Sequence, residues 1–358
     1  PYANLFEKEL LDTTFATGAY DLIMIDDPWF PRLAENHKLE ALQPLYRARG
    51  LAGPEEDFIP ACLAVCRQPF PTGTLYALPY VGNAQLFFYR ADLFAERGWP
   101  PPGTWEEVLR AARDLTRPGL YGYVMRAGED NAIVADFMPL FWAFGAEMFS
   151  ADGRVAVDSP EALAALKFML ELGRYAPPGY VSFNADEVSA HLLQGTAAMS
   201  INWPAWIPAM DNPHKSRVAG KMAFTLMPSG RRVGQAEIGN WLLAIPRSAP
   251  HRDRAFDFLL WATAPPQMRQ AALRGNPPTR FSVFRDPELV RRFRAYPAQL
   301  ESLRTSRPRP RTPYWNEIEN AFGIYLSQAN AGRLSPEEAL SRATRDIAAI
   351  MERTGWKP

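Results

Sequence analysis

Short apolar runs alternate along this chain with segments that begin like helices. The run at residues 20–25, Tyr-Asp-Leu-Ile-Met-Ile, is mostly apolar and branched, as a strand buried on both faces is. Similar runs occupy residues 75–80, 85–89, 120–125, 197–203, 222–227 and 241–245. Polar caps followed by apolar residues at helical spacing separate several of these runs. The alternation predicts an α/β architecture.

Specific capping residues mark three of the predicted helices. Thr104 followed three residues later by Glu107 is a capping box, in which each side chain hydrogen-bonds the other residue's backbone N–H. The other two starts are serine-proline pairs, which suit the first helical turn. These starts lie at Thr104, Ser159 and Ser335, and the helices should end before Pro118, at Gly173 and near Gly355.

The length of the chain, 358 residues, favours two domains, because a single hydrophobic core stops growing beyond about 250–300 residues. Proline makes up 34 of these residues, about twice its usual share, which excludes coiled coils and long uninterrupted helices. Arginine and proline alternate at residues 304–313. A sheet interior cannot accommodate that stretch, so we expect extended chain between two bodies.

Charge and motifs exclude several functions. The 39 basic and 39 acidic side chains cancel, so no basic excess is present to bind nucleic acid or an anionic membrane. The longest strongly apolar stretch, at residues 137–149, is shorter than the roughly 20 residues of a spanning helix. No hydrolase elbow, zinc-protease helix, phosphate loop or dinucleotide fingerprint occurs, and the histidines lack metal-ligand spacing. We expect no metal, no cofactor and no catalysis.

The two cysteines, Cys62 and Cys66, are four residues apart, which fits neither a zinc site nor a thioredoxin motif. We interpret them as small apolar residues on one helical face. A local disulfide is the alternative, and it would require an oxidising compartment.

Aromatic residues gather beside polar residues where strands and helices should end. In α/β proteins, ligands bind at the loops beyond the strand ends. Flat aromatic faces pack against the C–H faces of a sugar, while carboxylates and amides bind its hydroxyl groups. The pattern therefore indicates a site for a polyhydroxylated ligand. The five clusters are Asp26-Asp27-Pro28-Trp29, residues 79–83, residues 202–206, Gly239-Asn240-Trp241 and residues 313–316.

At these clusters the chain resembles family 1 extracellular solute-binding proteins of ABC importers, the group that includes maltose-binding protein. Residues 18–29, 76–80 with 86–94, and the Pro-Pro-Gly-Thr-Trp-Glu-Glu segment at 101–107 match the family's patterns, followed in order by 195–203, 239–246 and 335–340. The resemblance implies a two-lobed periplasmic-binding-protein fold with crossing hinge strands and a central ligand cleft. One lobe would contain residues 1–82 and 242–306, the other 86–237 and 313–358, with hinges near 82–85, 237–241 and 307–312.

The resemblance also implies which residues line the cleft. They come from the loops after the early strand, from the first two crossings, and from later loops and helix starts. The expected ligand contacts are Asp26, Asp27, Trp29, Tyr80, Asn83, Trp203, Gly239, Asn240, Trp241, Arg280 and Trp315, with Glu129 and Asp130 as weaker candidates.

The expected function is capture of a carbohydrate or polyol by hinge closure and delivery to membrane permease subunits. Two alternatives stay open. Arg280 could bind a phosphate or sulfonate, which would make the ligand an anionic sugar or glycerol derivative. A glycosidase would need two carboxylates across a cleft, and Asp27 with Glu129 or Glu237 is the available pairing.

The family resemblance sets the remaining expectations. We expect a monomer in the periplasm or outside the cell, with or without a lipid anchor. Family members begin with a strand, a helix and a second strand ahead of the position of Pro1, so about 40 residues are expected to precede it, besides a signal peptide.

Overall fold

The computed structural model describes residues 2–129 and 131–358, and the chain divides into two compact units. Unit 1 consists of Pro1–Ala84 and Ile238–Trp315, and unit 2 of Gln85–Glu237 and Asn316–Pro358. The chain therefore passes from one unit to the other after Ala84, after Glu237 and after Trp315. The expected third hinge at residues 307–312 lies inside unit 1, where Arg309 and Arg311 form ion pairs with Asp27.

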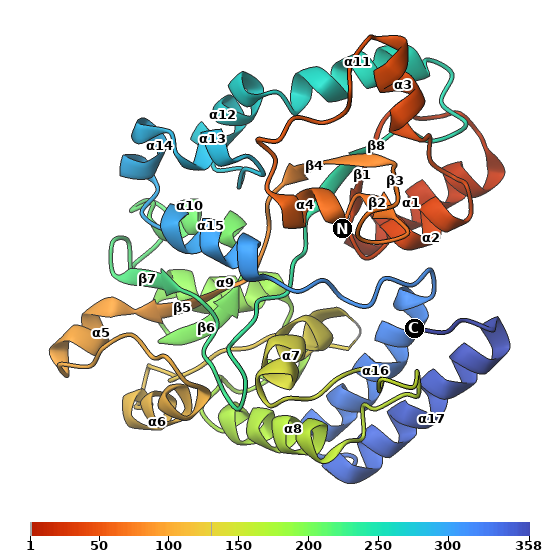
Figure 1. The fold of residues 1–358 in the computed structure, drawn as a ribbon. Coiled ribbons are helices and arrows are strands. Elements are labelled where there is room, and N and C mark those ends of the chain that lie inside the picture. Colours follow the sequence, from red (N-terminus) through yellow and green to blue (C-terminus); the bar gives the residue numbers. More distant parts are fainter. Residues whose placement is uncertain (1, 130) are drawn as a thin grey trace. The chain divides into compact units, whose positions relative to one another are not determined.

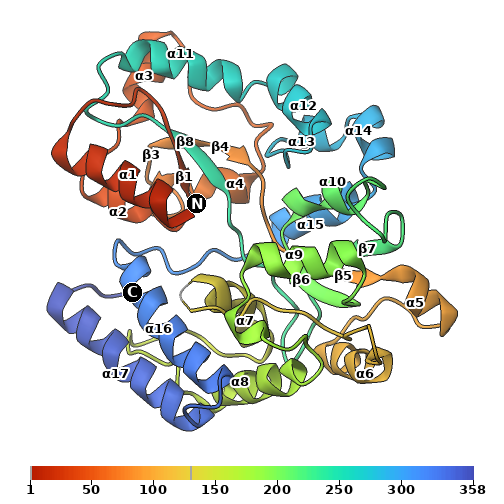
Figure 2. The ribbon, with the colours of Figure 1, turned by 180° about the vertical axis from the view of Figure 1, so that it is seen from behind.

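Unit 1 contains a three-stranded sheet in the order β1-β8-β4, formed by β1 (Ile23–Asp26), β4 (Ala77–Val81) and β8 (Trp241–Ala244). Both pairings are antiparallel, with Asp26 and Val81 opposite Trp241. Strands β1 and β4 thus run in the same direction and end beside the start of β8, the middle strand of the sheet. Figures 1 and 2 show the three strands together, from opposite sides. This shared edge brings together the loop after β1, the loop after β4 and the loop before β8.

The remaining elements of unit 1 are a short hairpin and surrounding helices. They are β2 (Arg67–Gln68), β3 (Thr74–Leu75), α1 (Tyr2–Phe15), α2 (Phe30–Glu35), α3 (Leu42–Ala48), α4 (Pro60–Ala64), α11 (Arg252–Ala262), α12 (Pro265–Leu273), α13 (Phe281–Phe284), α14 (Pro287–Arg292) and α15 (Tyr296–Thr305).

Unit 2 is built on a second three-stranded antiparallel sheet, in the order β6-β5-β7, formed by β5 (Leu86–Arg90), β6 (Met199–Asn202) and β7 (Met222–Thr225). Every residue of the central strand β5 is buried. Residues 86–89 are apolar or aromatic, as a buried strand requires, and Arg90 pairs with Asp92. The helices of unit 2 are α5 (Ala91–Glu96), α6 (Trp105–Leu115), α7 (Asn131–Ala143), α8 (Pro160–Gly173), η1 (Tyr180–Ser182), α9 (Ala185–Gln194), η2 (Pro204–Trp206), α10 (Ile207–Met210), α16 (Trp315–Asn330), whose first residue belongs to unit 1, and α17 (Pro336–Thr354).

The capping signals identified in the sequence are confirmed. The Thr104 hydroxyl accepts the Glu107 N–H, and the Glu107 carboxylate accepts the Thr104 N–H, at 3.2 Å each. The Ser159 hydroxyl accepts the Ala162 N–H at the start of α8, and the Ser335 hydroxyl accepts the Glu338 N–H at the start of α17. Helix α17 ends at Gly355 in the left-handed conformation, which glycine adopts at little cost.

Six of the seven predicted strands are present, and the strand predicted at residues 120–125 is wrong. This segment runs beside β6 and makes a few bonds to its surroundings, such as the Val124 N–H to the Met199 carbonyl at 3.0 Å. The pairing is interrupted at Tyr123, whose N–H donates to the Tyr175 carbonyl at 3.2 Å instead of to β6. No regular ladder can form across that break.

The two cysteines are buried and free, so they behave as small apolar residues and the disulfide alternative is not formed. Burial raises the pKa of the Cys62 thiol to about 12, which keeps it protonated.

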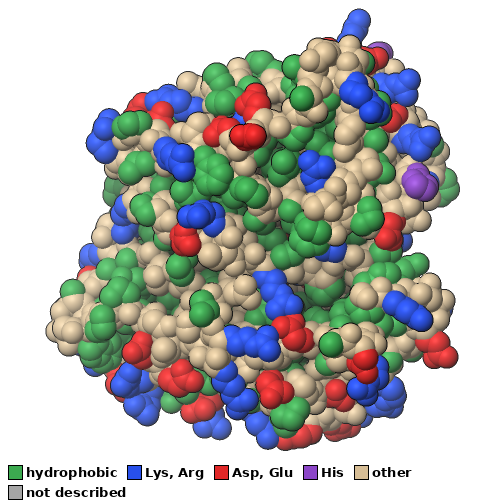
Figure 3. Space-filling view, viewed as in Figure 1, with side chains coloured by type: hydrophobic (Ala, Val, Ile, Leu, Met, Phe, Trp, Pro, Cys, Tyr) green, Lys and Arg blue, Asp and Glu red, His purple; other side chains and the backbone are tan. Residues whose placement is uncertain are grey.

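Within residues 2–129 and 131–358, no helix combines the length and apolarity needed to cross a membrane, and no three His, Cys, Asp or Glu side chains converge as a metal site would require. Basic and acidic side chains are interspersed on the face in Figure 3, in keeping with the zero net charge.

Candidate functional site

Hydrogen bonds connect three loops of unit 1 at the edge of the sheet where β1 and β4 end. The Asn83 N–H donates to the side-chain oxygen of Asn240 at 2.8 Å, and the Gly239 N–H donates to the Asn83 carbonyl at 2.7 Å. The Asp27 N–H donates to the Asn240 carbonyl at 3.0 Å. The loops after β1, after β4 and before β8 are therefore fixed relative to one another.

Asp27 is fully buried and pairs with two arginines of the crossing segment. Its two carboxylate oxygens lie 3.2 Å from Arg309 Nη2 and 2.9 Å from Arg311 Nη1. Arg311 also donates to the carbonyl oxygens of Asp27 and Val65, at 3.0 and 2.8 Å. Burial raises the pKa of Asp27 and the two guanidinium groups oppose that rise. Both oxygens thus bind protein, and Asp27 anchors residues 309–311.

Three aromatic rings pack against one another in unit 1, and Trp29 lies at their centre. Trp29 is 1% exposed and packs edge-to-face on Trp241, with ring centroids 5.7 Å apart. Its ring centroid lies 4.8 Å from that of Phe6 in α1. Trp241 and Tyr80 keep part of their surfaces exposed. Trp29 therefore supports the Trp241 ring, while Trp241 and Tyr80 present aromatic surface to solvent. We call Tyr80, Asn83, Asn240 and Trp241 the unit 1 site.

The side-chain oxygen of Asn83 is an uncommitted acceptor within the unit 1 site. Asn83 is 8% exposed, and its oxygen is buried without a hydrogen-bond partner among the described residues. An unsatisfied buried acceptor costs about 1–3 kcal/mol, which a ligand hydroxyl could recover.

Two other predicted contacts of unit 1 are enclosed by protein. Arg280 is 3% exposed, donates to Glu55 at 2.6 Å and to the Thr263 carbonyl at 2.7 Å, and lies over the Phe58 ring at 3.8 Å. Asp57 lies 3.4 Å from the same guanidinium. Trp315 is fully buried. Arg280 is thus neutralised by two carboxylates, and Trp315 has no exposed ring surface in this structure.

In unit 2, Trp203 follows β6 and lies against a buried ion pair. The Arg126 guanidinium carbon is 5.3 Å from the Trp203 ring centroid, and Arg126 donates to Asp136 from its Nε at 2.6 Å and from its backbone N–H at 2.7 Å. Arg126 and Asp136 are 3% and 4% exposed, and burial raises the pKa of Asp136 while Arg126 opposes that rise. Trp203 itself is half-buried. We call Trp203, Arg126 and Asp136 the unit 2 site.

The weaker candidates lie apart from these clusters or outside the described residues. Glu129 is exposed and lines a cavity of about 400 Å³ with Asn184 and Arg333. Asp130 lies outside the described residues. Glu237 is buried, and its N–H donates to the Gln85 side chain at 3.2 Å.

Sequence reasoning missed Arg126, Asp136 and a buried glutamate, Glu9. Asp136 carried a readable signal, because it is the one charged residue of the otherwise apolar helix α7. A charge in such a helix requires a buried partner. Glu9, in α1, is 4% exposed, and burial, together with the nearby Asp26 carboxylate, raises its pKa to about 8.

Comparisons with known proteins agree on a class of protein. The family model described as bacterial extracellular solute-binding protein matches residues 1–269. A mannitol-binding protein from Pseudomonas aeruginosa is 31% identical, over 79% of this chain and 71% of its own length. A probable amino-acid ABC transporter periplasmic-binding protein from Sinorhizobium fredii is 28% identical, over 99% of this chain and 82% of its own length.

A solved structure matches both the fold and the extent of the chain. The ABC transporter solute-binding protein of Agrobacterium radiobacter, crystallised with ribitol, superposes with a TM-score of 0.90 at 27% identity, covering 98% of this chain and 89% of its own. Two α/β units joined by three crossings are the architecture of a binding protein for small solutes. The chain belongs to the bacterial extracellular solute-binding proteins, and its fold is that of the two-lobed, maltose-binding-protein-like members.

Replacing Asp27 by Asn should lower the free energy of unfolding by about 3–5 kcal/mol, because two buried guanidinium groups would lose the carboxylate that pairs with both. Urea unfolding of the full chain measures the change. Asp253→Asn is the matched control, because Asp253 pairs with Arg49 on the surface, and that change should stay within about 0.5 kcal/mol. Equal effects of the two substitutions would contradict the anchoring role of Asp27.

Glu9 should make the protein less stable as the pH rises. Its folded pKa of about 8 lies above the unfolded value near 4.5, so its contribution is complete below about pH 4.5 and is lost as the pH rises through 8. Compared with Glu9→Gln, the wild type should lose about 4 kcal/mol between pH 5 and pH 9, measured by urea unfolding.

Glu7→Gln, at an exposed position of the same helix, is the control and should leave the pH dependence unchanged. A Glu9→Gln variant with the same pH dependence as the wild type would show that Glu9 does not titrate in this range.

Proposed function

We propose that this protein is the solute-binding component of an ABC importer and that its solute is a neutral polyol or sugar. The solute is bound unchanged, in the periplasm or outside the cell, and passes to the membrane permease. Capture by hinge closure at the three crossings is part of the proposal. Relatives of the chain are named for mannitol binding or were crystallised with ribitol, which supports this class of ligand.

One observation carries the choice of a neutral ligand: Arg126, Asp27 and Arg280 each already pair with side chains of opposite charge. Arg126 pairs with Asp136, Asp27 pairs with Arg309 and Arg311, and Arg280 pairs with Glu55 and Asp57. What remains for a ligand is half-buried aromatic surface on Tyr80, Trp203 and Trp241 and the buried amide oxygen of Asn83. Aromatic faces and amides suit C–H groups and hydroxyls.

The same pairing argues against the two charged ligand classes. A phosphorylated or sulfonated ligand would have to draw Arg280 away from its two carboxylates. An amino acid, the solute in the name of one relative, needs a free cation and a free carboxylate near each other. Breaking a buried pair to provide either would cost several kcal/mol.

The proposal assigns different roles to the predicted contacts. Trp203, Tyr80 and Trp241 would pack against the carbon skeleton, and Asn83 would accept a hydroxyl hydrogen. Asp27, Trp29 and Arg280 would hold the loops in place without contacting the ligand, because each is enclosed by protein partners. The ion pair of Arg126 and Asp136 would fix the orientation of the Trp203 ring.

Replacing Trp203 by Ala should weaken polyol binding about tenfold, because it removes the stacking surface. Isothermal titration calorimetry on the purified protein, with D-mannitol or ribitol, whichever binds more tightly, measures the change. Trp261→Ala is the matched control, because Trp261 is 55% exposed on α11 and lies outside the site. Unchanged affinity in the Trp203 variant would overturn its role, and failure of both polyols to bind the wild type at millimolar concentration would overturn the polyol assignment.

A further inference from the structure

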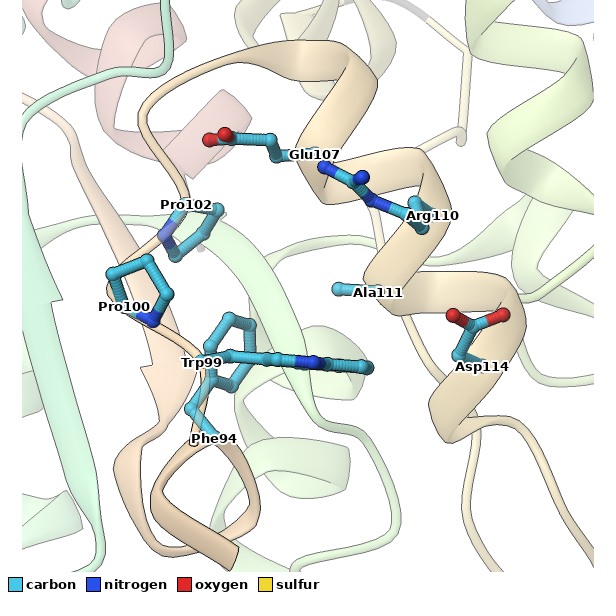
Figure 4. Close-up of a pocket in the computed structure, with 8 residues that line it drawn as sticks. All are labelled: Phe94, Trp99, Pro100, Pro102, Glu107, Arg110, Ala111 and Asp114. Atoms are coloured by element: carbon cyan, nitrogen blue, oxygen red, sulfur yellow. The ribbon is translucent and has the colours of Figure 1, made fainter. Parts of the chain in front are cut away.

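A second concave feature lies in unit 2, beside the Pro-Pro-Gly-Thr-Trp-Glu-Glu segment at residues 101–107. A cavity of about 280 Å³ opens between the end of α5 and helix α6 (Figure 4). Trp99, Pro100 and Pro102 contribute apolar walls, and Glu107, Arg110 and Asp114 contribute charged groups. None of these residues belongs to the unit 1 or unit 2 site. We call this cavity the α6 pocket.

The Trp99 ring forms a fixed surface in the α6 pocket. Phe94 packs against it edge-on, with centroids 5.6 Å apart, and the Arg97 guanidinium carbon lies 4.9 Å from the ring centroid. Arg97 is itself held by a hydrogen bond to the Asp114 carbonyl at 3.0 Å. In Figure 4 the ring is seen edge-on beneath Arg110 and Ala111, so the ring faces helix α6 across the pocket.

The polar groups of the α6 pocket come from one face of helix α6. Glu107, Arg110 and Asp114 are spaced by three and four residues, which places them in a row along the helix. Glu107 uses one carboxylate oxygen to accept the Gly103 and Thr104 N–H groups, at 2.8 and 3.2 Å. Arg110 has neither a hydrogen bond nor an ion pair within the described residues. Asp114 uses one carboxylate oxygen to accept from Arg113 Nε at 3.1 Å. The row therefore offers the Arg110 guanidinium and the second carboxylate oxygens of Glu107 and Asp114 to a bound molecule.

An aromatic surface beside charged groups of both signs disfavours an ionic ligand and favours a neutral sugar ring. An anion would meet Glu107 and Asp114, and a cation would meet Arg110. A pyranose has an apolar C–H face for Trp99 and hydroxyls that both donate and accept at its edge. The volume is at the lower end of small-ligand pockets, roughly 300–1,000 Å³, which fits one ring.

We propose that the α6 pocket is a second saccharide site, in which one pyranose ring stacks on Trp99 and its hydroxyls bind Arg110, Glu107 and Asp114. The ring could belong to a free monosaccharide or to the end of a glycan, since both present the same chemistry. An open-chain polyol lacks a continuous ring face and binds more weakly here. The pocket is independent of the importer ligand, because it shares no residue with either site.

Indole N–H signals in the spectrum of the ¹⁵N-labelled full chain test the proposal. Trp99→Ala and Trp203→Ala assign one signal to the α6 pocket and one to the unit 2 site. Methyl glycosides of glucose, galactose and mannose are titrated to about 50 mM, and at least one should shift the Trp99 signal saturably with a millimolar midpoint. Because the Trp203 signal is read separately, failure of the importer ligand assignment would not obscure this result.

The Arg110→Gln variant keeps the test valid if Trp99→Ala does not fold, since Arg110 is exposed. It should raise the midpoint at least about threefold, whereas Arg117→Gln, an exposed arginine beyond the end of α6, should leave it unchanged. D-Mannitol should shift the Trp99 signal less than the active glycoside. An oligosaccharide midpoint at least about tenfold lower identifies a glycan as the occupant, and an equal midpoint identifies the free sugar.

Two results would overturn the proposal. One is a Trp99 signal that none of the three glycosides shifts, and the other is an Arg110→Gln midpoint equal to that of the wild type.

Discussion

The pairing of one buried carboxylate with two arginines organises unit 1. Asp27 follows β1 directly, and Arg309 and Arg311 lie in the irregular segment that precedes α16. A buried Asp without these partners would be too costly to keep charged, and the arginines equally need a carboxylate. The pairing therefore fixes the course of residues 309–311, and Arg311 extends the connection to the Val65 carbonyl after α4. The Asp27 N–H also holds Asn240, so the same residue positions the loop before β8.

Ion pairs of this kind determine which chemical groups the proposed site offers to a ligand. In the proposed site, charged side chains that pair with one another are not available to bind a ligand, so the surfaces that remain are aromatic rings and amides. Trp241 rests on Trp29, and Trp203 rests on Arg126, so each ring is held from behind by a residue that is itself buried. Preorganised rings of this kind lose little conformational freedom on binding, which favours affinity for a ligand with few charged groups.

Much of the fold could be predicted from local sequence, because capping boxes, serine-proline starts and short apolar runs act over a few residues. The strand predicted at residues 120–125 was wrong because the Tyr123 N–H donates to the carbonyl of Tyr175, a residue distant in the chain, instead of to β6. Aromatic clusters and a family resemblance led to the loops that we propose as the site. The sequence could not separate Trp29 and Trp315, which are buried, from Trp203, which keeps exposed surface, because the neighbours that bury them are distant in the chain. The pairing of Asp27 with Arg309 and Arg311, residues about 280 positions away, was beyond local reasoning for the same reason.

The most direct test of the account is a thermal-shift comparison of neutral and charged solutes on the purified full-length protein. D-Mannitol, ribitol and neutral sugars form one group, and mannitol 1-phosphate, glycerol phosphate and amino acids form the other. A solute at 100 times its dissociation constant adds about 2.7 kcal/mol of stability, which raises Tm by a few degrees. We expect that a neutral polyol or sugar raises Tm and that the charged solutes do not. A shift with a phosphorylated solute or an amino acid, and with no neutral solute, would contradict it.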